Sequence, residues 1–196
     1  TKFNAKDAAV WMTLGDFYAS LKRIEDAEKQ FLKGIEIDPK KVALYLHLGD
    51  FYLAMGKKDK AIETYTKAID IDSKSIPALS RLAEVYLNEK KYEEASNEIE
   101  KILKVNNKSN EGIFLKGRLY LAKQQFNEAL NLLQPYVKDN PKAPLGHYYL
   151  GLAHLGNKDF MQAKTELGEA VKLNPKWDEA RLILGDLYLR TGAFDL

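Results

Sequence analysis

The stretch WMTLGDFYASLKRIEDAEKQF, from Trp11 to Phe31, is nearly repeated by YLHLGDFYLAMGKKDKAIETY, from Tyr45 to Tyr65. Both stretches contain Leu-Gly-Asp-Phe-Tyr, an alanine nine residues after that tyrosine, and an aromatic residue four positions further on. Self-similarity at a fixed period of about 20 to 50 residues is typical of repeat architectures, in which each repeat buries its apolar face against its neighbours. This repeat therefore decides the fold.

The period, which is the spacing from Trp11 to Tyr45, holds along the chain without insertion or deletion when repeat 1 begins at Ala8. Position 8 of each repeat is small: Gly15, Gly49, Ala83, Gly117, Gly151, Gly185. Position 11 is aromatic: Tyr18, Tyr52, Tyr86, Tyr120, His154, Tyr188. Position 20 is always alanine: Ala27, Ala61, Ala95, Ala129, Ala163. Position 24 is large and apolar: Phe31, Tyr65, Ile99, Leu133, Leu167.

Within each repeat the apolar residues recur at helical intervals, and a polar break such as LKRIED separates two runs of about a dozen residues. Each repeat is therefore predicted to be a helix, a short turn and a second helix. The small residues at positions 8 and 20 let the two helices approach closely. Pro39, Pro141 and Pro175, or Ser73 and Asn107, then close a repeat before the next helix begins.

These positions together resemble the tetratricopeptide repeat (TPR) family over residues 8–196. The resemblance implies an all-α, right-handed superhelical solenoid of stacked helix-turn-helix units. The predicted organisation is a tail of a preceding repeat (1–7), five repeats (8–41, 42–75, 76–109, 110–143 and 144–177) and the first helix of a truncated sixth repeat (178–196).

Three features modify this picture. Pro135 lies inside the second helix of repeat 4, where its missing N–H predicts a kink or an early helix end. Both ends of the array look incomplete, so the sequence is interpreted as a fragment of a longer protein, in the style of bacterial multi-repeat proteins. Because solenoids need polar caps, self-association through the open C-terminal end is expected.

Composition narrows the function classes. Thirty basic and 28 acidic residues give a net charge of +2, which offers no basic stripe for nucleic acid. No apolar run approaches the roughly 20 residues that a membrane-spanning helix needs. The chain has no cysteine, which excludes disulfides and thiolate metal sites. The compartment stays open between the cytoplasm and a bacterial periplasm or envelope.

No pattern indicates catalysis, so the segment is predicted not to be an enzyme. His47, His147 and His154 fall at three different repeat positions, and His147 and His154 are too far apart along one helix to share a metal ion. His154 stands at the packed tyrosine position and is predicted to be a core residue. The glycines of GHYYLGLAHLG do not form a phosphate-binding loop. No cofactor and no metal are expected.

The family resemblance also implies a concave surface, lined by the first helix of each repeat, that binds a peptide or a partner segment. Position 9 of this surface is acidic in four of six repeats, which favours a basic partner or, equally, local hydrogen bonds. In repeat 5, Leu145, Tyr148, Leu152 and Leu155 form a second apolar stripe, which predicts an anchor for a partner. The predicted partner-binding residues are Asp16, Asp50, Glu84, Phe114, Arg118, Leu121, Leu145, Tyr148, Leu152 and Leu155.

The first hypothesis for function is thus a non-enzymatic scaffold that binds a protein or peptide in its groove. The alternative is a regulatory or substrate-presenting segment of a larger enzyme or of an envelope or exopolysaccharide secretion assembly. A competing interpretation of the apolar stripe is that it covers a neighbouring repeat or a second copy of the chain.

Overall fold

A computed structural model describes residues 6–192, which form eleven α-helices and no strand. Most of the tail predicted at residues 1–7, and the last four residues of the predicted sixth repeat, lie outside the described residues. The chain divides between Val85 and Tyr86 into two compact bodies, called here the N-terminal body and the C-terminal body. The boundary falls within helix α5.

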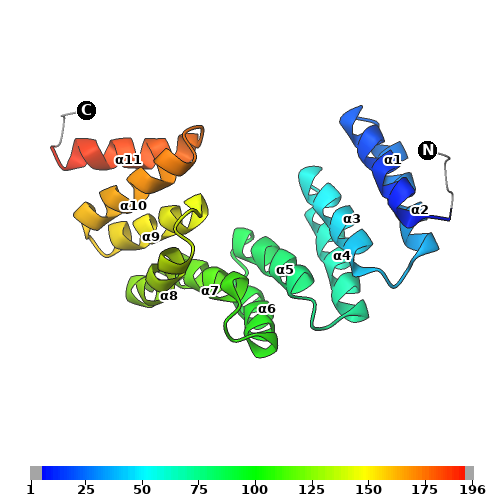
Figure 1. The fold of residues 1–196 in the computed structure, drawn as a ribbon, viewed down its shortest axis with the longest axis horizontal. Helices are drawn as coiled ribbons and strands as arrows, with labels where there is room; N and C mark the ends of the chain where they lie inside the picture. The colour runs from blue at the N-terminus through cyan, green and yellow to red at the C-terminus, as the bar shows by residue number, and fades with distance from the viewer. Residues whose placement is uncertain (1–5, 193–196) are drawn as a thin grey trace. The chain divides into compact units, whose positions relative to one another are not determined.

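Helices of about equal length follow one another along both bodies, and Figure 1 colours them in chain order from blue to red. The N-terminal body contains α1 (Ala8–Ser20), α2 (Ile24–Ile37), α3 (Val42–Ala54), α4 (Lys58–Ile71) and most of α5 (Ile76–Asn88). The C-terminal body contains α6 (Tyr92–Val105), α7 (Asn110–Ala122), α8 (Phe126–Asp139), α9 (Pro144–Gly156), α10 (Phe160–Leu173) and α11 (Asp178–Arg190). Within these bodies α1 packs on α2, α3 on α4, α7 on α8 and α9 on α10.

The turn inside each repeat has one residue in the left-handed backbone region. These residues, all at position 15, are Lys22, Gly56, Lys90, Gln124, Lys158 and Gly192, with φ between 59° and 71°. In the first turn, Lys22 N–H donates to Ala19 O and Arg23 N–H to Tyr18 O, which satisfies the last carbonyls of α1. Side chains other than glycine are strained in this region, so four of the six turns carry a local cost.

The glycines at position 8 are required by the large side chains at position 24. A Cβ atom on Gly117 would lie 2.7 Å from Leu133 Cδ2, and one on Gly151 would lie 2.8 Å from Leu167 Cγ. The rings of Phe31 and Tyr65 cover Gly15 and Gly49 more closely still. The position-24 side chains are themselves fully buried. Small and large positions thus interlock across each helix pair.

The predicted early end of the second helix in repeat 4 is wrong. Helix α8 continues through Pro135 to Asp139 and is 14 residues long, like the other second helices. Pro135 is exposed, so its ring projects away from the core. Asn131, four residues earlier, whose carbonyl loses its helical hydrogen bond, is exposed as well.

Repeats that end in proline share a further contact. The side chain six residues after the proline donates to its carbonyl: Tyr45 to Pro39 at 2.9 Å and Arg181 to Pro175 at 3.4 Å. His147 Nε2 lies 3.0 Å from Pro141 O in the same way. After Ser73 and Asn107 the equivalent residues are the apolar Leu79 and Ile113. A polar side chain therefore occurs at this position wherever a proline precedes it.

Candidate functional site

The acidic side chains at position 9 are engaged within the fold. Asp16 Oδ1 lies 2.7 Å from His47 Nε2, and Asp186 Oδ2 lies 2.7 Å from Arg190 Nε. Asp50 accepts the Tyr65 hydroxyl at 2.7 Å. It also lies 3.0 Å from Arg81 Nε. Glu84 is half-buried and has an interaction partner as well. Of the two interpretations of this acidic row, local bonding describes these contacts, and no basic partner is needed to explain them.

Two of the residues that pair with this row, His47 and Arg81, stand at position 6 of the following repeat. His47 follows Asp16, and Arg81 follows Asp50, at the same distance along the chain. The same spacing joins the Arg118 guanidinium to the Tyr149 ring, 4.8 Å from its centroid. Position 6 was missed by sequence reasoning because its chemistry changes from repeat to repeat. The fixed offset from position 9 to position 6 of the next repeat is the signal that identifies it.

Arg118 and Phe114 belong to a cluster of side chains on α7, α8 and α9 that contains three aromatic rings, those of Phe114, Tyr136 and Tyr149. The Phe114 ring stacks on Tyr136, with centroids 5.0 Å apart, and meets Tyr149 edge-on at 5.6 Å. Phe114 itself is buried. Beside the group lies a small cavity of about 180 Å³ lined by Leu87, Asn88, Arg118, Leu121, Ala122 and Tyr149. Arg118 and Leu121 therefore face this cavity, whereas Phe114 supports it from the core.

The sequence predicts that Tyr148 faces the groove, but in the structure its side chain does not reach solvent. Its ring is 4% exposed and lies 4.4 Å from the Trp177 ring, at the start of α11. Burial, together with a hydrogen bond to Glu179, raises the pKa of Tyr148. The ring thus belongs to the core between α9 and α11.

Leu152 and Leu155 border a cavity of the C-terminal body. It has a volume of about 570 Å³ and opens between α9, α10 and α11. Both leucines are half-buried and rest on the core cluster of α9, α10 and α11, so they form the floor and wall of the cavity. Its lining residues are Leu152, Leu155, Gly156, Lys158, Phe160, Leu182, Ile183, Asp186, Leu187 and Arg190.

Two exposed apolar side chains lie at the mouth of this cavity. Leu182 is 74% exposed and Phe160 is 44% exposed. Among the charged lining residues, Arg190 pairs with Asp186. Leu145 is 49% exposed and lies near the start of α9, whereas the cavity is lined by residues near the end of that helix. Leu145 is therefore not part of the lining. The predicted stripe is therefore divided: two of its residues line the cavity, Tyr148 is buried and Leu145 stands apart.

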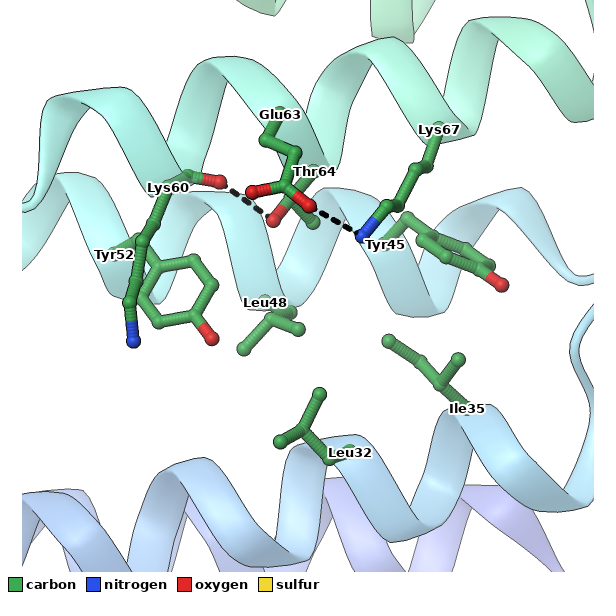
Figure 2. A pocket seen from close by; sticks show the side chains of 9 residues that line it. All are labelled: Leu32, Ile35, Tyr45, Leu48, Tyr52, Lys60, Glu63, Thr64 and Lys67. Carbon is green, nitrogen blue, oxygen red and sulfur yellow. Dashed lines mark hydrogen bonds and ion pairs between the residues drawn. The ribbon is translucent and has the colours of Figure 1, made fainter.

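The N-terminal body has a cavity of about 360 Å³ between α2, α3 and α4. Figure 2 shows Leu32 and Ile35 of α2 facing Leu48 of α3, with charged residues of α4 at the rim. Those rim groups bond one another: Lys67 donates to Glu63 at 2.6 Å, and the Thr64 hydroxyl donates to Lys60 O at 2.6 Å.

Next to that cavity lies a carboxylate whose pKa is strongly lowered. Glu28 accepts hydrogen bonds from Tyr52 at 2.9 Å, Lys57 at 3.2 Å and Lys60 at 2.7 Å. Burial alone would raise its pKa, but these bonds outweigh burial and lower the pKa of Glu28 to about 2. The carboxylate ties α2 to α3 and α4 and is a structural group.

Among residues 6–192 no group of three or more histidine, aspartate and glutamate side chains is arranged to hold a metal ion. The same residues contain no helix with both the length and the apolar character needed to cross a membrane.

Comparisons with known families agree along the chain. Family models described as tetratricopeptide repeat match residues 8–41, 31–63, 52–113, 114–160 and 151–196. A comparison with curated protein sequences finds no match.

Several solved structures share the fold. The APC/C hetero-tetramer Cut9-Hcn1 matches with a TM-score of 0.83 and 18% identity, over 95% of this chain but only 37% of that one. TTC0263, a thermophilic TPR protein of Thermus thermophilus, matches with a TM-score of 0.74 and 16% identity, over 93% of this chain and 99% of that one. YrrB, described as a TPR protein with an unusual peptide-binding site, matches with a TM-score of 0.62 and 18% identity, over 92% of this chain and 93% of that one. The predicted fold class is confirmed.

Proposed function

Because the chain belongs to the tetratricopeptide repeat family, whose members are protein-interaction scaffolds, we propose that it is a non-enzymatic module that binds a peptide or partner segment. The proposed anchor is the cavity between α9, α10 and α11. Its partner is a peptide that inserts a large apolar side chain, with polar groups at the edge. The family resemblance supplies the expectation that the surface of the first helices is a concave groove.

The observation that supports this site most strongly is the apolar mouth. Leu182 exposes 74% of its surface beside a hollow of about 570 Å³. Large apolar side chains that border a concavity are typical of interaction sites. Burying a leucine side chain is favourable by about 1.5–3 kcal/mol, so one inserted side chain from a partner and Leu182 would together supply useful binding free energy.

Arg118 and Leu121 form the second proposed contact. They face the small cavity on α5, α7 and α9, and the guanidinium lies against the Tyr149 ring. Asp16 and Asp50 remain candidates of lower rank, because local partners already use their carboxylates. Glu84 ranks with them because it also has an interaction partner.

The test uses a matched pair of exposed apolar residues. Peptides are selected from a displayed library on the purified chain, and their affinities are measured by calorimetry against Leu182→Lys and Met161→Lys. Leu182 and Met161 are 74% and 72% exposed, but only Leu182 lines the cavity. We expect Leu182→Lys to weaken binding at least tenfold and Met161→Lys to leave it unchanged. Equal affinities for both variants would refute the site.

Sedimentation of the wild type over a range of concentrations provides the complementary measurement, because the exposed face of α11 is also where self-association is expected. A dimer that disappears in Leu182→Lys would mean that a second copy of the chain occupies the cavity. A monomer at all concentrations leaves the cavity to a different partner.

The second candidate is a segment of a larger enzyme or secretion assembly. The match to Cut9-Hcn1, of which this chain spans only 37% of the length, shows that this fold also occurs as part of a longer chain. The full open reading frame on both sides of the sequence tests it: a catalytic domain in the same frame supports this candidate, and further repeats alone argue against it.

A further inference from the structure

The cavity between α9, α10 and α11 has a counterpart one repeat earlier. The small cavity on α5, α7 and α9 is lined by positions 9, 12 and 13 of repeat 4 and by position 6 of repeat 5. The same four positions, one repeat later, line the cavity beside α11. Both are therefore the same kind of hollow between successive first helices. Their volumes nevertheless differ about threefold, at about 180 Å³ and about 570 Å³.

The side chains at these shared positions account for the difference in volume. At position 9, repeat 4 has Arg118 and repeat 5 has Leu152. At position 6 of the following repeat, Tyr149 is exchanged for Ile183. Position 12 is leucine in both cases. Each exchange puts a smaller aliphatic side chain where repeat 4 has a guanidinium or an aromatic ring. Room that repeat 4 fills from within is thus left open beside α11.

The contact between Arg118 and Tyr149 shows what fills this room in repeat 4. The guanidinium lies 4.8 Å from the centroid of the Tyr149 ring, and that half-buried ring meets Phe114 edge-on at 5.6 Å. A flat ring therefore fits between successive first helices of this fold. We infer that a partner supplies the missing ring beside α11, so that the anchor of the bound peptide is an aromatic side chain that enters between Leu152 and Ile183. This inference deepens the proposed function and rests on it.

The walls of the open cavity are aliphatic. Leu152 and Ile183 are half-buried and pack on the core cluster of α9, α10 and α11, and Leu187, which also lines the cavity, is buried. Because these side chains are supported by the core, they form firm surfaces for an inserted group. An aromatic side chain buries about 150–250 Å², and dispersion contacts accumulate with the number of atoms that touch the walls. A large flat ring therefore gains most from such a site.

Phe160 adds a ring of the protein's own at the mouth. The equivalent residue of repeat 4, Phe126, is half-buried and packs on Gly156. Helix α11 has Arg190 at the position of that glycine, and Phe160 lines the cavity while 44% exposed. Aromatic rings attract one another in edge-to-face or offset arrangements beyond the effect of burial alone. The Phe160 ring therefore favours an aromatic anchor over an aliphatic one.

The N-terminal body has polar pairs at the positions that form this hollow. Asp16 Oδ1 lies 2.7 Å from His47 Nε2, and Asp50 Oδ1 lies 3.0 Å from Arg81 Nε. An apolar ring placed over either pair would remove polar groups from water without offering them a hydrogen bond, which is unfavourable. The aromatic anchor is therefore expected beside α11 and not on α1, α3 or α5.

An aliphatic side chain is the competing anchor. A leucine would enter the same mouth, but it would leave part of the room empty that a ring and a guanidinium fill in repeat 4. Empty space beside a bound side chain forfeits dispersion contacts. A peptide with a ring at the anchor should therefore bind more tightly than the same peptide with leucine, by roughly three- to tenfold.

The first experiment changes the anchor on the peptide. Library peptides whose binding is weakened by Leu182→Lys are sequenced, and each large apolar residue is replaced in turn by leucine or alanine. We expect these peptides to share one phenylalanine, tyrosine or tryptophan. Replacing it by leucine should weaken binding roughly three- to tenfold, and replacing it by alanine should weaken binding more. Cavity-bound peptides with an aliphatic anchor, or with equal affinity after the change to leucine, would overturn the inference and leave the proposed function standing.

The second experiment fills the cavity from within. The double variant Leu152→Arg/Ile183→Tyr transplants the pair of repeat 4 into repeat 5 and repeat 6, and Met161→Lys is the control. The new side chains take the room of the peptide's ring, so the affinity of the cavity-bound peptides should fall at least about tenfold. The control should keep the wild-type affinity. Circular dichroism reports whether the double variant is folded, and undiminished binding to the folded variant would overturn the inference.

Small probes decide the matter if no peptide binds or if the double variant does not fold. N-acetyl-tyrosinamide and N-acetyl-leucinamide are titrated into the wild-type chain with ¹³C-labelled methyl groups. The aromatic probe should shift the signals of Leu152 and Ile183 at concentrations where the leucine probe shifts them little. Leu21, an exposed leucine of the N-terminal body, controls for non-specific contact. Equal shifts with both probes, or none, would overturn the inference, whereas failure of every peptide would refute the proposed function alone.

Discussion

Arg81 Nε lies 3.0 Å from Asp50 Oδ1, and the same carboxylate accepts the hydroxyl hydrogen of Tyr65 at 2.7 Å. The three side chains come from α5, α3 and α4, so one carboxylate joins three successive helices. Burial and the bond to Asp50 raise the pKa of Tyr65. An acidic residue that would be assigned to a binding surface from its position therefore has a structural role.

This role predicts different outcomes for two aspartates at the same repeat position. Asp50→Ala leaves the Tyr65 hydroxyl without an acceptor, so the free energy of unfolding should fall by about 1–3 kcal/mol. Asp16→Ala removes only an exposed pair with His47 and should cost less than about 1 kcal/mol. Urea unfolding of both variants measures the difference. Equal losses would show that the Tyr65 bond contributes nothing.

The glycines at position 8 offer a second comparison. Gly151→Ala places a methyl group 2.8 Å from Leu167 Cγ, and overpacking of this kind should cost about 1–3 kcal/mol. In Gly185→Ala the new methyl group meets no atom within 4 Å among residues 6–192, apart from its chain neighbours and the nearby backbone of α11. Since alanine is a better helix former than glycine by about 1 kcal/mol, Gly185→Ala should stabilise α11 slightly. Thermal unfolding should thus shift in opposite directions, and a matching shift would contradict the interlocking of positions 8 and 24.

The fold was predictable because its determinants are local and recur. Alanine at position 20 and glycine at position 8 are each constrained by one neighbouring helix. The same small residues therefore recur in nearly every repeat. Pro135 misled the prediction for a physical reason. Its ring lies on the exposed side of α8, where neighbouring packing holds the helix together and the unbonded carbonyl is not buried.

The candidate site was predictable only in outline. Leu152 and Leu155 border the cavity as the apolar stripe suggested, but Tyr148 is covered by Trp177, which follows the proline loop at the end of the repeat. Whether an apolar side chain faces solvent or the next repeat depends on packing between repeats. Likewise, His47 and Arg81, the charged partners of Asp16 and Asp50, come from the next repeat, so a single repeat considered alone does not reveal them.

The left-handed turn residue supports a third prediction. Lys22 has φ of 60° and Gly56, at the same position of the next repeat, has φ of 71°. A side chain in this region costs roughly 1–2 kcal/mol, part of which the greater freedom of glycine in the unfolded chain offsets. Lys22→Gly should therefore raise the unfolding midpoint, and Gly56→Lys should lower it. A lower midpoint for Lys22→Gly, measured by urea unfolding, would show that the Lys22 turn is not strained.

Acid stability supplies the fourth prediction, through Glu28. Its pKa in the folded chain, about 2, is below its usual value of 4.5 because the bonds from Lys60, Tyr52 and Lys57 outweigh burial. A lowered carboxyl pKa stabilises the fold above the usual value, and this contribution is lost as pH falls from about 4.5 toward 2. Lys57 and Lys60 are themselves well exposed, so solvent screening limits the contribution to roughly 1–2 kcal/mol.

Glu28→Gln keeps the shape of the side chain and removes its charge. The variant should be less stable than the wild type at pH 7 by that amount, and the two should converge as pH approaches 2. Glu63→Gln is the control, because the Glu63 carboxylate is 65% exposed and pairs along α4 with Lys67; its loss should have little effect at any pH. Urea unfolding at pH 7, 4 and 2.5 measures these differences. A gap between wild type and Glu28→Gln that persists at pH 2.5 would mean that shape and packing, and not the charge of Glu28, hold α2 to α3 and α4.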